Sequence, residues 1–73
     1  MEAVSAYNMR VGSLVKNTFS DHLLIVFKIS EEKMGNGLTY KSHKLRDLYR
    51  DHIVDLTFVN GKNEFNTYFV VSY

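Results

Sequence analysis

The segment HLLIVFKIS, residues 22–30, gives the strongest strand signal in the chain. It combines β-branched and aromatic side chains, which favour strands. Both faces of such a strand would be apolar, because Leu24 and Val26 alternate with Ile25 and Phe27. A run of five consecutive apolar residues is typical of a strand that is covered on both faces. We therefore predict that residues 22–30 form the central strand of a sheet.

A second strand is predicted near the C-terminus, followed by a tight turn. Residues 53–59 (IVDLTFV) alternate between apolar and polar positions, as a strand with one buried face does. Asn60 and Gly61 come next, and this dipeptide favours the positive φ angles of a type I′ hairpin turn. We therefore expect the chain to turn back here and to pair with the segment that follows.

Residues 62–73 (KNEFNTYFVVSY) are predicted to form this returning strand. Odd-numbered positions from Phe65 to Val71 are expected to face the core, which leaves Tyr68 and Val70 facing outward. In a small barrel the last strand is often an edge, and this one carries few charges and no Pro to protect it from pairing with another chain.

The N-terminal third is predicted to add one more strand. Residues 11–17 (VGSLVKN) are typical of a short strand with a bend at Gly12. Residues 1–10 (MEAVSAYNMR) have no clean period, so we expect an N-terminal arm. The chain is thus predicted to be one domain of about five strands, drawn from residues 11–30 and 53–73.

Residues 31–52 are expected to form an insertion between these strands. Within it, residues 38–52 (LTYKSHKLRDLYRDH) fit one or two helical turns, with Ser42 as a cap. The apolar face of that helix would consist of Leu45, Leu48, Tyr49 and His52. An irregular loop with a β edge is the alternative.

The composition indicates a small globular domain. The chain has 73 residues, a hydrophobic fraction of 45% and a formal net charge of +1, which disfavours disorder. It has no Cys, so disulfides and thiolate chemistry are excluded. Its longest apolar run, residues 23–27, is far shorter than the roughly 20 residues of a membrane span. We therefore expect no membrane segment, and no signal peptide because no apolar region follows Glu2.

Four segments carry a resemblance to a known fold: residues 11–16 (VGSLVK), 24–29 (LIVFKI), 54–62 (VDLTFVNGK) and 64–71 (EFNTYFVV). Their order resembles the small SH3-like β-barrels of many short phage-encoded proteins. The resemblance covers about half the chain. It implies a five-stranded SH3-like barrel and a virion component or accessory protein, located in the virion or the host cytoplasm. An α+β domain, with one helix packed on a curved antiparallel sheet, is the alternative fold.

No residue pattern predicts catalysis, a cofactor or a metal site. The chain lacks a nucleophile motif, and no two of His22, His43 and His52 have the i, i+4 spacing of a zinc motif. His43 and Asp47 are four residues apart and would form a solvated pair on the predicted helix. We therefore expect a non-enzymatic protein with no small-molecule substrate.

The aromatic content favours a protein interface. Five Tyr and five Phe exceed what one small core easily accommodates, and aromatic side chains are enriched at interfaces. We predict contacts with a protein partner or a second copy through exposed aromatics and the C-terminal strand. The candidate interface residues are Tyr68, Val70, Tyr73, Tyr49 and Tyr40. A small inhibitor or adaptor of a host protein fits the same features.

Nucleic-acid binding is the alternative function. Between Tyr40 and Arg50, cations are interleaved with tyrosines, and such residues can contact phosphates and stack on bases. The candidate residues are Lys41, Lys44, Arg46 and Arg50. Residues 28–52 contain six Lys or Arg and four Asp or Glu, so this segment has a net charge of only +2. A dedicated nucleic-acid binder is usually more basic.

Overall fold

The computed structural model describes residues 2–61 and 67–73, which contain six strands and no helix. The strands are β1 (Glu2–Ala3), β2 (Leu14–Asn17), β3 (Leu23–Lys33), β4 (Thr39–Asp47), β5 (Ile53–Val59) and β6 (Tyr68–Ser72). They form one antiparallel sheet in the order β1-β6-β2-β3-β4-β5. The prediction of a mainly β chain is confirmed, whereas the helix of the α+β alternative is absent from the described residues.

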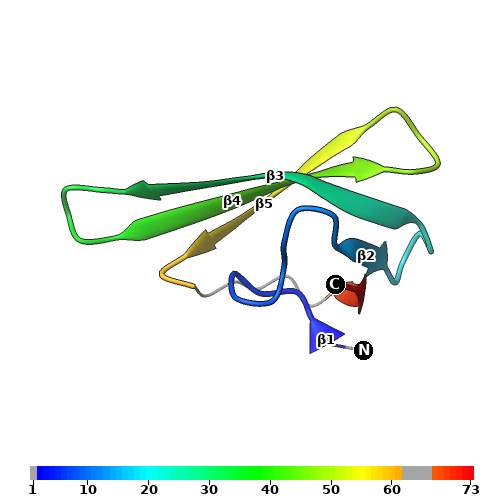
Figure 1. Cartoon of the computed structure of the whole chain (residues 1–73), viewed down its shortest axis with the longest axis horizontal. Coiled ribbons are helices and arrows are strands. Elements are labelled where there is room, and N and C mark those ends of the chain that lie inside the picture. Colours follow the sequence, from blue (N-terminus) through cyan, green and yellow to red (C-terminus); the bar gives the residue numbers. More distant parts are fainter. Residues whose placement is uncertain (1, 62–66) are drawn as a thin grey trace.

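Strand β3 is the longest element and joins the two halves of the sheet, as its apolar sequence predicts. Its first residues pair with β2, and almost its whole length pairs with β4. The register shifts between Val26 and Lys28, which marks a β-bulge. In Figure 1 the far end of the β3–β4 hairpin projects beyond the rest of the molecule.

The sheet is strongly bent but not closed. Strands β1 and β5 are its two edges, and no pairing between them is found in the described part of the chain. Figure 1 shows β3, β4 and β5 lying over β2, β6 and the N-terminal segment. The described residues therefore form an open six-stranded sheet, where the sequence predicted a closed five-stranded barrel.

The core lies on the concave inner face of this sheet. Its buried apolar side chains come from all the longer strands and from the N-terminal segment: Val4, Ala6, Met9, Val15, Leu24, Val26, Leu45, Leu56, Phe58 and Val70. The expectation of a separate N-terminal arm is wrong, because residues 4–9 contribute three of these side chains. Their spacing follows a turn and not a helix or strand, so the segment has no periodic signal in the sequence.

The N-terminal turn is built by two small polar residues. The backbone N–H of Ser5 donates to Oδ1 of Asn8 over 2.9 Å, and the N–H of Asn8 donates back to Oγ of Ser5 over 3.2 Å. The side-chain amide of Asn8 also donates to the carbonyl of Ala3. These bonds satisfy backbone groups that the turn removes from the β ladder. They hold Ala6 and Met9 against the core.

The segment expected to be an insertion belongs to the sheet. Residues 31–33 continue β3, and the predicted helix at 38–52 is replaced by β4 and a short loop. His43 and Leu45 alternate inward along β4 and are fully buried, whereas Leu48 and Tyr49 of the predicted helical face are exposed in the loop. Pairing on both sides, with β3 and with β5, outweighs the weak local helix preference.

The Asn60-Gly61 turn has the predicted backbone geometry but a different role. Their φ angles are +52° and +77°, as a type I′ turn requires. The described strands β5 and β6 are nevertheless not neighbours, so the predicted hairpin is not formed between them. Asn60 instead extends the β4–β5 ladder, because its N–H donates to the carbonyl of Thr39 and its Oδ1 accepts from the N–H of Thr39.

The two faces of the last strand are the reverse of the prediction. Val70 pairs with Val15 and is buried, whereas Val71 is 48% exposed. Tyr68 is half-buried and packs against the core. The predicted alternation counted from Phe65, which lies outside the described residues, whereas β6 begins at Tyr68.

Candidate functional site

The outer face of β3 is apolar over residues 23–27 and is partly exposed to solvent. Leu24 and Val26 point inward and are buried, while Leu23 and Ile25 point outward and are half-buried. Phe27, at the bulge, is 39% exposed. A continuously apolar strand is expected to be covered on both faces. Within the described residues only the inner face of β3 is covered by a core.

Two further exposed side chains lie next to this strand. Val71 of β6 and Tyr49 of the β4–β5 loop line a shallow hollow together with Leu23 and the ion pair of Lys16 and Asp21. Tyr49 is 65% exposed. We use the term "apolar patch" for the group Leu23, Ile25, Phe27, Tyr49 and Val71.

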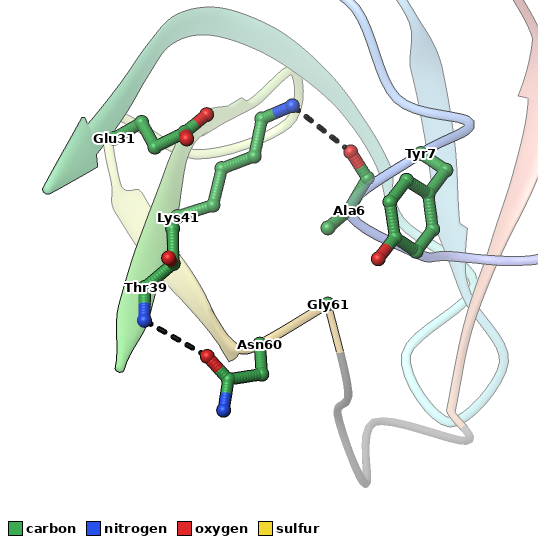
Figure 2. A pocket seen from close by; sticks show the side chains of 7 residues that line it. All are labelled: Ala6, Tyr7, Glu31, Thr39, Lys41, Asn60 and Gly61. Carbon is green, nitrogen blue, oxygen red and sulfur yellow. Dashed lines mark hydrogen bonds between the residues drawn. The ribbon is translucent and has the colours of Figure 1, made fainter. Parts of the chain in front are cut away.

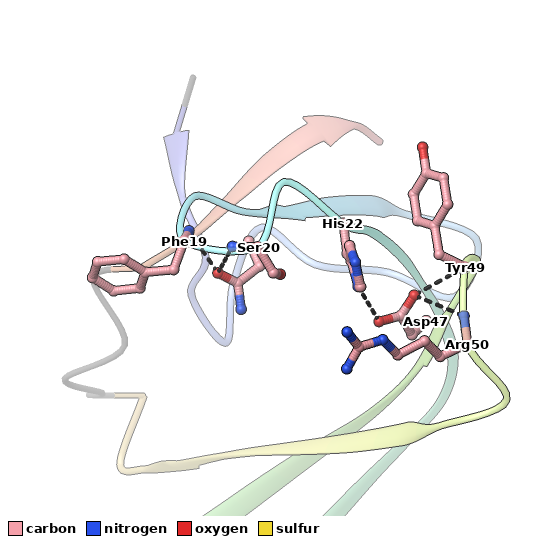
Figure 3. Close-up of polar contacts among 7 residues, drawn as sticks. Phe19, Ser20, His22, Asp47, Tyr49 and Arg50 are labelled. Atoms are coloured by element: carbon pink, nitrogen blue, oxygen red, sulfur yellow. Dashed lines mark hydrogen bonds and ion pairs between the residues drawn. The ribbon is translucent and has the colours of Figure 1, made fainter.

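Asp47 fixes the loop that carries Tyr49. Its Oδ1 accepts hydrogen bonds from the N–H groups of Tyr49, over 2.8 Å, and of Arg50, over 3.3 Å. Its Oδ2 lies 2.8 Å from Nδ1 of His22, and the His22 ring packs at 5.2 Å from the Tyr49 ring (Figure 3). Asp47, the last residue of β4, therefore sets the position of Tyr49 in the apolar patch.

The same contacts favour an ionised Asp47. Burial raises the pKa of this carboxyl group, but hydrogen bonds from the Tyr49 N–H and from His22, with the charge of His22, outweigh burial and lower the pKa overall. An ionised Asp47 is the better acceptor for all three donors. Asp47 also orients the His22 imidazole, and together these contacts tie the β4–β5 loop to the start of β3.

Cations border the apolar patch on the β4 side. Lys28 and Lys44 lie directly opposite each other in the β3–β4 ladder, and Arg46 lies further along β4 on the same face. The Arg46 guanidinium lies 5.9 Å from the centre of the Phe27 ring. No ion pair of Lys28 or Lys44 is found within the described ranges, although Asp55 of β5 lies opposite Lys44 in the ladder. Arg46 lies 3.8 Å from Asp51. We call Lys28, Lys44 and Arg46 the basic cluster.

The predicted interface residues are distributed over different parts of the molecule. Tyr49 and Tyr73 are exposed, Tyr40 and Tyr68 are half-buried, and Val70 is buried in the core. The prediction that Val70 faces outward is therefore wrong. Strand β6 is not an edge either, because it lies between β1 and β2. Of the predicted set, the structure places only Tyr49 in the apolar patch.

The predicted nucleic-acid residues are also separated. Lys44 and Arg46 share the outer face, but Lys41 points to the inner side, where its Nζ donates to the carbonyl of Ala6 over 3.1 Å (Figure 2). Arg50 lies in the β4–β5 loop. Lys28 is not among the predicted residues, because its position opposite Lys44 depends on the register of two strands. No local signal in the sequence indicates that register.

A second hollow lies on the other side of the molecule, at the junction of the N-terminal turn and the end of β5. It is lined by Ala6, Tyr7, Glu31, Thr39, Lys41, Asn60 and Gly61 (Figure 2). The Lys41–Ala6 and Thr39–Asn60 hydrogen bonds are made among its own walls. This hollow is therefore explained as the place where the N-terminal turn is attached to the sheet.

The His43–Asp47 pair predicted from the sequence does not form. On a strand, both residues point to the inner face, where His43 is fully buried and Asp47 turns to His22. Across residues 2–61 and 67–73, no three His, Asp or Glu side chains are grouped as metal ligands. The same residues include no helix that could cross a membrane.

Comparisons with known proteins give no relative for this chain: no family model, no curated protein and no solved structure matches it.

Proposed function

We propose that the protein is a non-enzymatic binding module that holds a partner protein on the outer face of its sheet. The observation that supports this is the apolar outer face of β3. Leu23, Ile25 and Phe27 remain accessible while Leu24 and Val26, on the other face of the same strand, are buried. Contiguous exposed apolar surface on a small soluble domain is typical of interaction sites.

A partner on the apolar patch would gain binding free energy from the apolar area that it covers. Each 100 Å² of apolar surface removed from water contributes roughly 2.5 kcal/mol. Association costs about 4–15 kcal/mol in lost translational and rotational freedom. A stable complex therefore requires several large side chains that act together, and the apolar patch provides three aliphatic and two aromatic ones.

The basic cluster indicates the kind of partner. Lys28 and Lys44 border the patch and form no ion pair in the described part of the chain, although Asp55 lies opposite Lys44. Carboxylates on a partner would complement these cations, Lys28 above all. A second copy would instead bring the same cations close to each other. We therefore propose a partner that presents an apolar stripe flanked by Asp or Glu.

A synthetic amphipathic helix with Leu on one face and Glu on the other is the test probe. We expect amide NMR shifts in β3, β6 and the Tyr49 loop, and weaker binding by Phe27→Ser. Phe19→Ser is the control, because Phe19 is 85% exposed and lies away from Tyr49 (Figure 3). No shifts, shifts confined to the β3–β4 hairpin tip, or equal weakening by both variants would contradict the proposal. So would shifts at the patch that appear on concentrating the protein without peptide.

Nucleic-acid binding is the second candidate, and one observation favours it. Like charges directly opposite each other destabilise a sheet, and Lys28 and Lys44 are such a pair, with Asp55 on the other side of Lys44 offsetting part of the repulsion. An anionic ligand would relieve this repulsion. With Arg46 beside them and the Phe27 ring available for stacking, single-stranded DNA or RNA is the polymer that fits.

Fluorescence anisotropy with single-stranded oligonucleotides at several salt concentrations tests this second candidate. Three phosphate contacts would give a slope of log K against log salt of about −2. We expect Lys44→Ala to make the slope shallower by about 0.7. Lys33→Ala, an exposed lysine at the end of β3, is the control and should leave it unchanged. Absence of binding at low salt would eliminate this candidate.

A further inference from the structure

His43 is an ionisable residue in the centre of the hydrophobic core. Its side chain is fully buried on the inner face of β4, where it lies opposite Ile29 of β3 and Leu56 of β5. The ring meets the Phe58 ring edge-on, with centroids 5.0 Å apart and planes at 85°. The outer-face binding site does not involve this imidazole.

Both ring nitrogens of His43 lack a hydrogen-bond partner among the residues that the structure describes. A neutral imidazole carries one donor and one acceptor, so burial leaves both unsatisfied. Protonation would add a second unsatisfied donor and a buried positive charge. Folding therefore strongly favours the neutral ring.

The charged groups around His43 do not stabilise an imidazolium ion. On β4, the charge of Lys41 opposes protonation of His43, and Asp47 at the other end of the strand is engaged by His22. On β3, Glu31 lies opposite Lys41. The described core residues of β5 and of the N-terminal segment are uncharged.

The direction of the pKa shift agrees with this geometry. Burial lowers the pKa of His43 from its ordinary value of 6.5, and repulsion by Lys41 lowers it further. The Leu56 backbone acts in the opposite direction, but its geometry falls short of a hydrogen bond. The ring is thus neutral in the closed protein at neutral pH and favours an opened state in acid.

We propose that His43 is an acid-sensitive latch, whose protonation opens the inner face by releasing residues 2–9. That segment buries Val4, Ala6 and Met9 in the same apolar cluster as Phe58, the residue on which the His43 ring packs. Strand β1 pairs with β6 at two residue positions, the Val4 N–H donates to the carbonyl of Tyr68, and Lys41, two residues from His43 on β4, donates to the carbonyl of Ala6. This inference does not depend on the outer-face proposal.

The size of the effect follows from proton linkage. When only the open state can take up the proton, with the ordinary pKa of 6.5, the opening equilibrium constant rises by up to about tenfold between pH 7.5 and pH 5.5. Lower pH favours opening, because the open state binds more protons than the closed state. This window lies above the range in which carboxyl groups titrate.

Hydrogen exchange of the Val4 amide, which donates to the carbonyl of Tyr68, reports the opening directly. We expect its protection factor to fall by up to about tenfold from pH 7.5 to pH 5.5 in the wild-type protein. The drop should vanish in His43→Leu and persist in His52→Gln, a substitution of an exposed histidine. Amides of the central β3–β4 ladder should keep their protection.

Three results would overturn the latch. The first is an equal fall of the Val4 protection factor in His43→Leu, and the second is no fall of this protection factor in the wild-type protein. The third is an equal loss of protection over the whole sheet, which indicates global unfolding. If His43→Leu does not fold, the His43 ring is titrated by NMR in the wild type. A ring that protonates while Val4 stays protected would also refute the latch.

Discussion

At the scale of single residues, the clearest difference between sequence and structure is the orientation of β6. Val70 and Val71 are adjacent and chemically identical, yet Val70 is 5% exposed and Val71 is 48% exposed. The alternation of apolar residues identifies two faces but does not say which one is buried when both are apolar. The buried face is chosen by the pairing of Val70 with Val15, a contact between distant parts of the chain.

The two valines make a matched test of this orientation. We expect Val70→Ala to lower the free energy of unfolding by about 2 kcal/mol, because it removes buried methyl groups and leaves a cavity. Val71→Ala should change it by less than about 0.5 kcal/mol, as is usual for exposed positions. Urea denaturation measures both. The opposite order of effects would restore the orientation predicted from the sequence.

At the scale of elements, β3 was predictable and β4 was not. The apolar run of β3 has no competing helical period, so its sequence indicates a strand without reference to the rest of the chain. In β4, the inward alternation of His43 and Leu45 coexists with a helical spacing of Leu45, Leu48 and Tyr49. Only long-range pairing with β3 and β5 selects the strand. The same pairing creates the basic cluster, which is why sequence alone did not locate it.

The turn after β5 is a testable element of this fold. Gly61 has a φ angle of +77°, and a Cβ atom there would overlap the ring of Tyr7. We expect Gly61→Ala to destabilise the protein by about 1 kcal/mol, from backbone strain at the positive φ angle, because the exposed Tyr7 side chain can move aside. Gly35→Ala is the control, because its Cβ would meet no atom within 4 Å and its φ is not positive. Equal stability of the two variants in thermal denaturation would contradict the turn geometry.

At the scale of the whole molecule, stability depends on how an open sheet covers its concave face. A closed barrel buries that face by pairing its first and last strands. Here the N-terminal segment covers part of it with Val4, Ala6 and Met9, each at most 3% exposed. The segment therefore acts as a component of the core, although its sequence suggested an arm.

Removing residues 1–9 tests this role. Burial of Val4 and Met9 alone contributes roughly 3–6 kcal/mol, and a domain of this size has only about 4–11 kcal/mol of net stability. We therefore expect the truncated chain to lose cooperative unfolding and to bind a hydrophobic dye, as followed by circular dichroism and fluorescence. The matched control is Tyr7→Ser in the full chain, since Tyr7 is 82% exposed within the same segment. A truncated chain that unfolds cooperatively with unchanged stability would show that the segment is an arm after all. The core would then have to be covered without it, and the latch at His43 would have nothing to release.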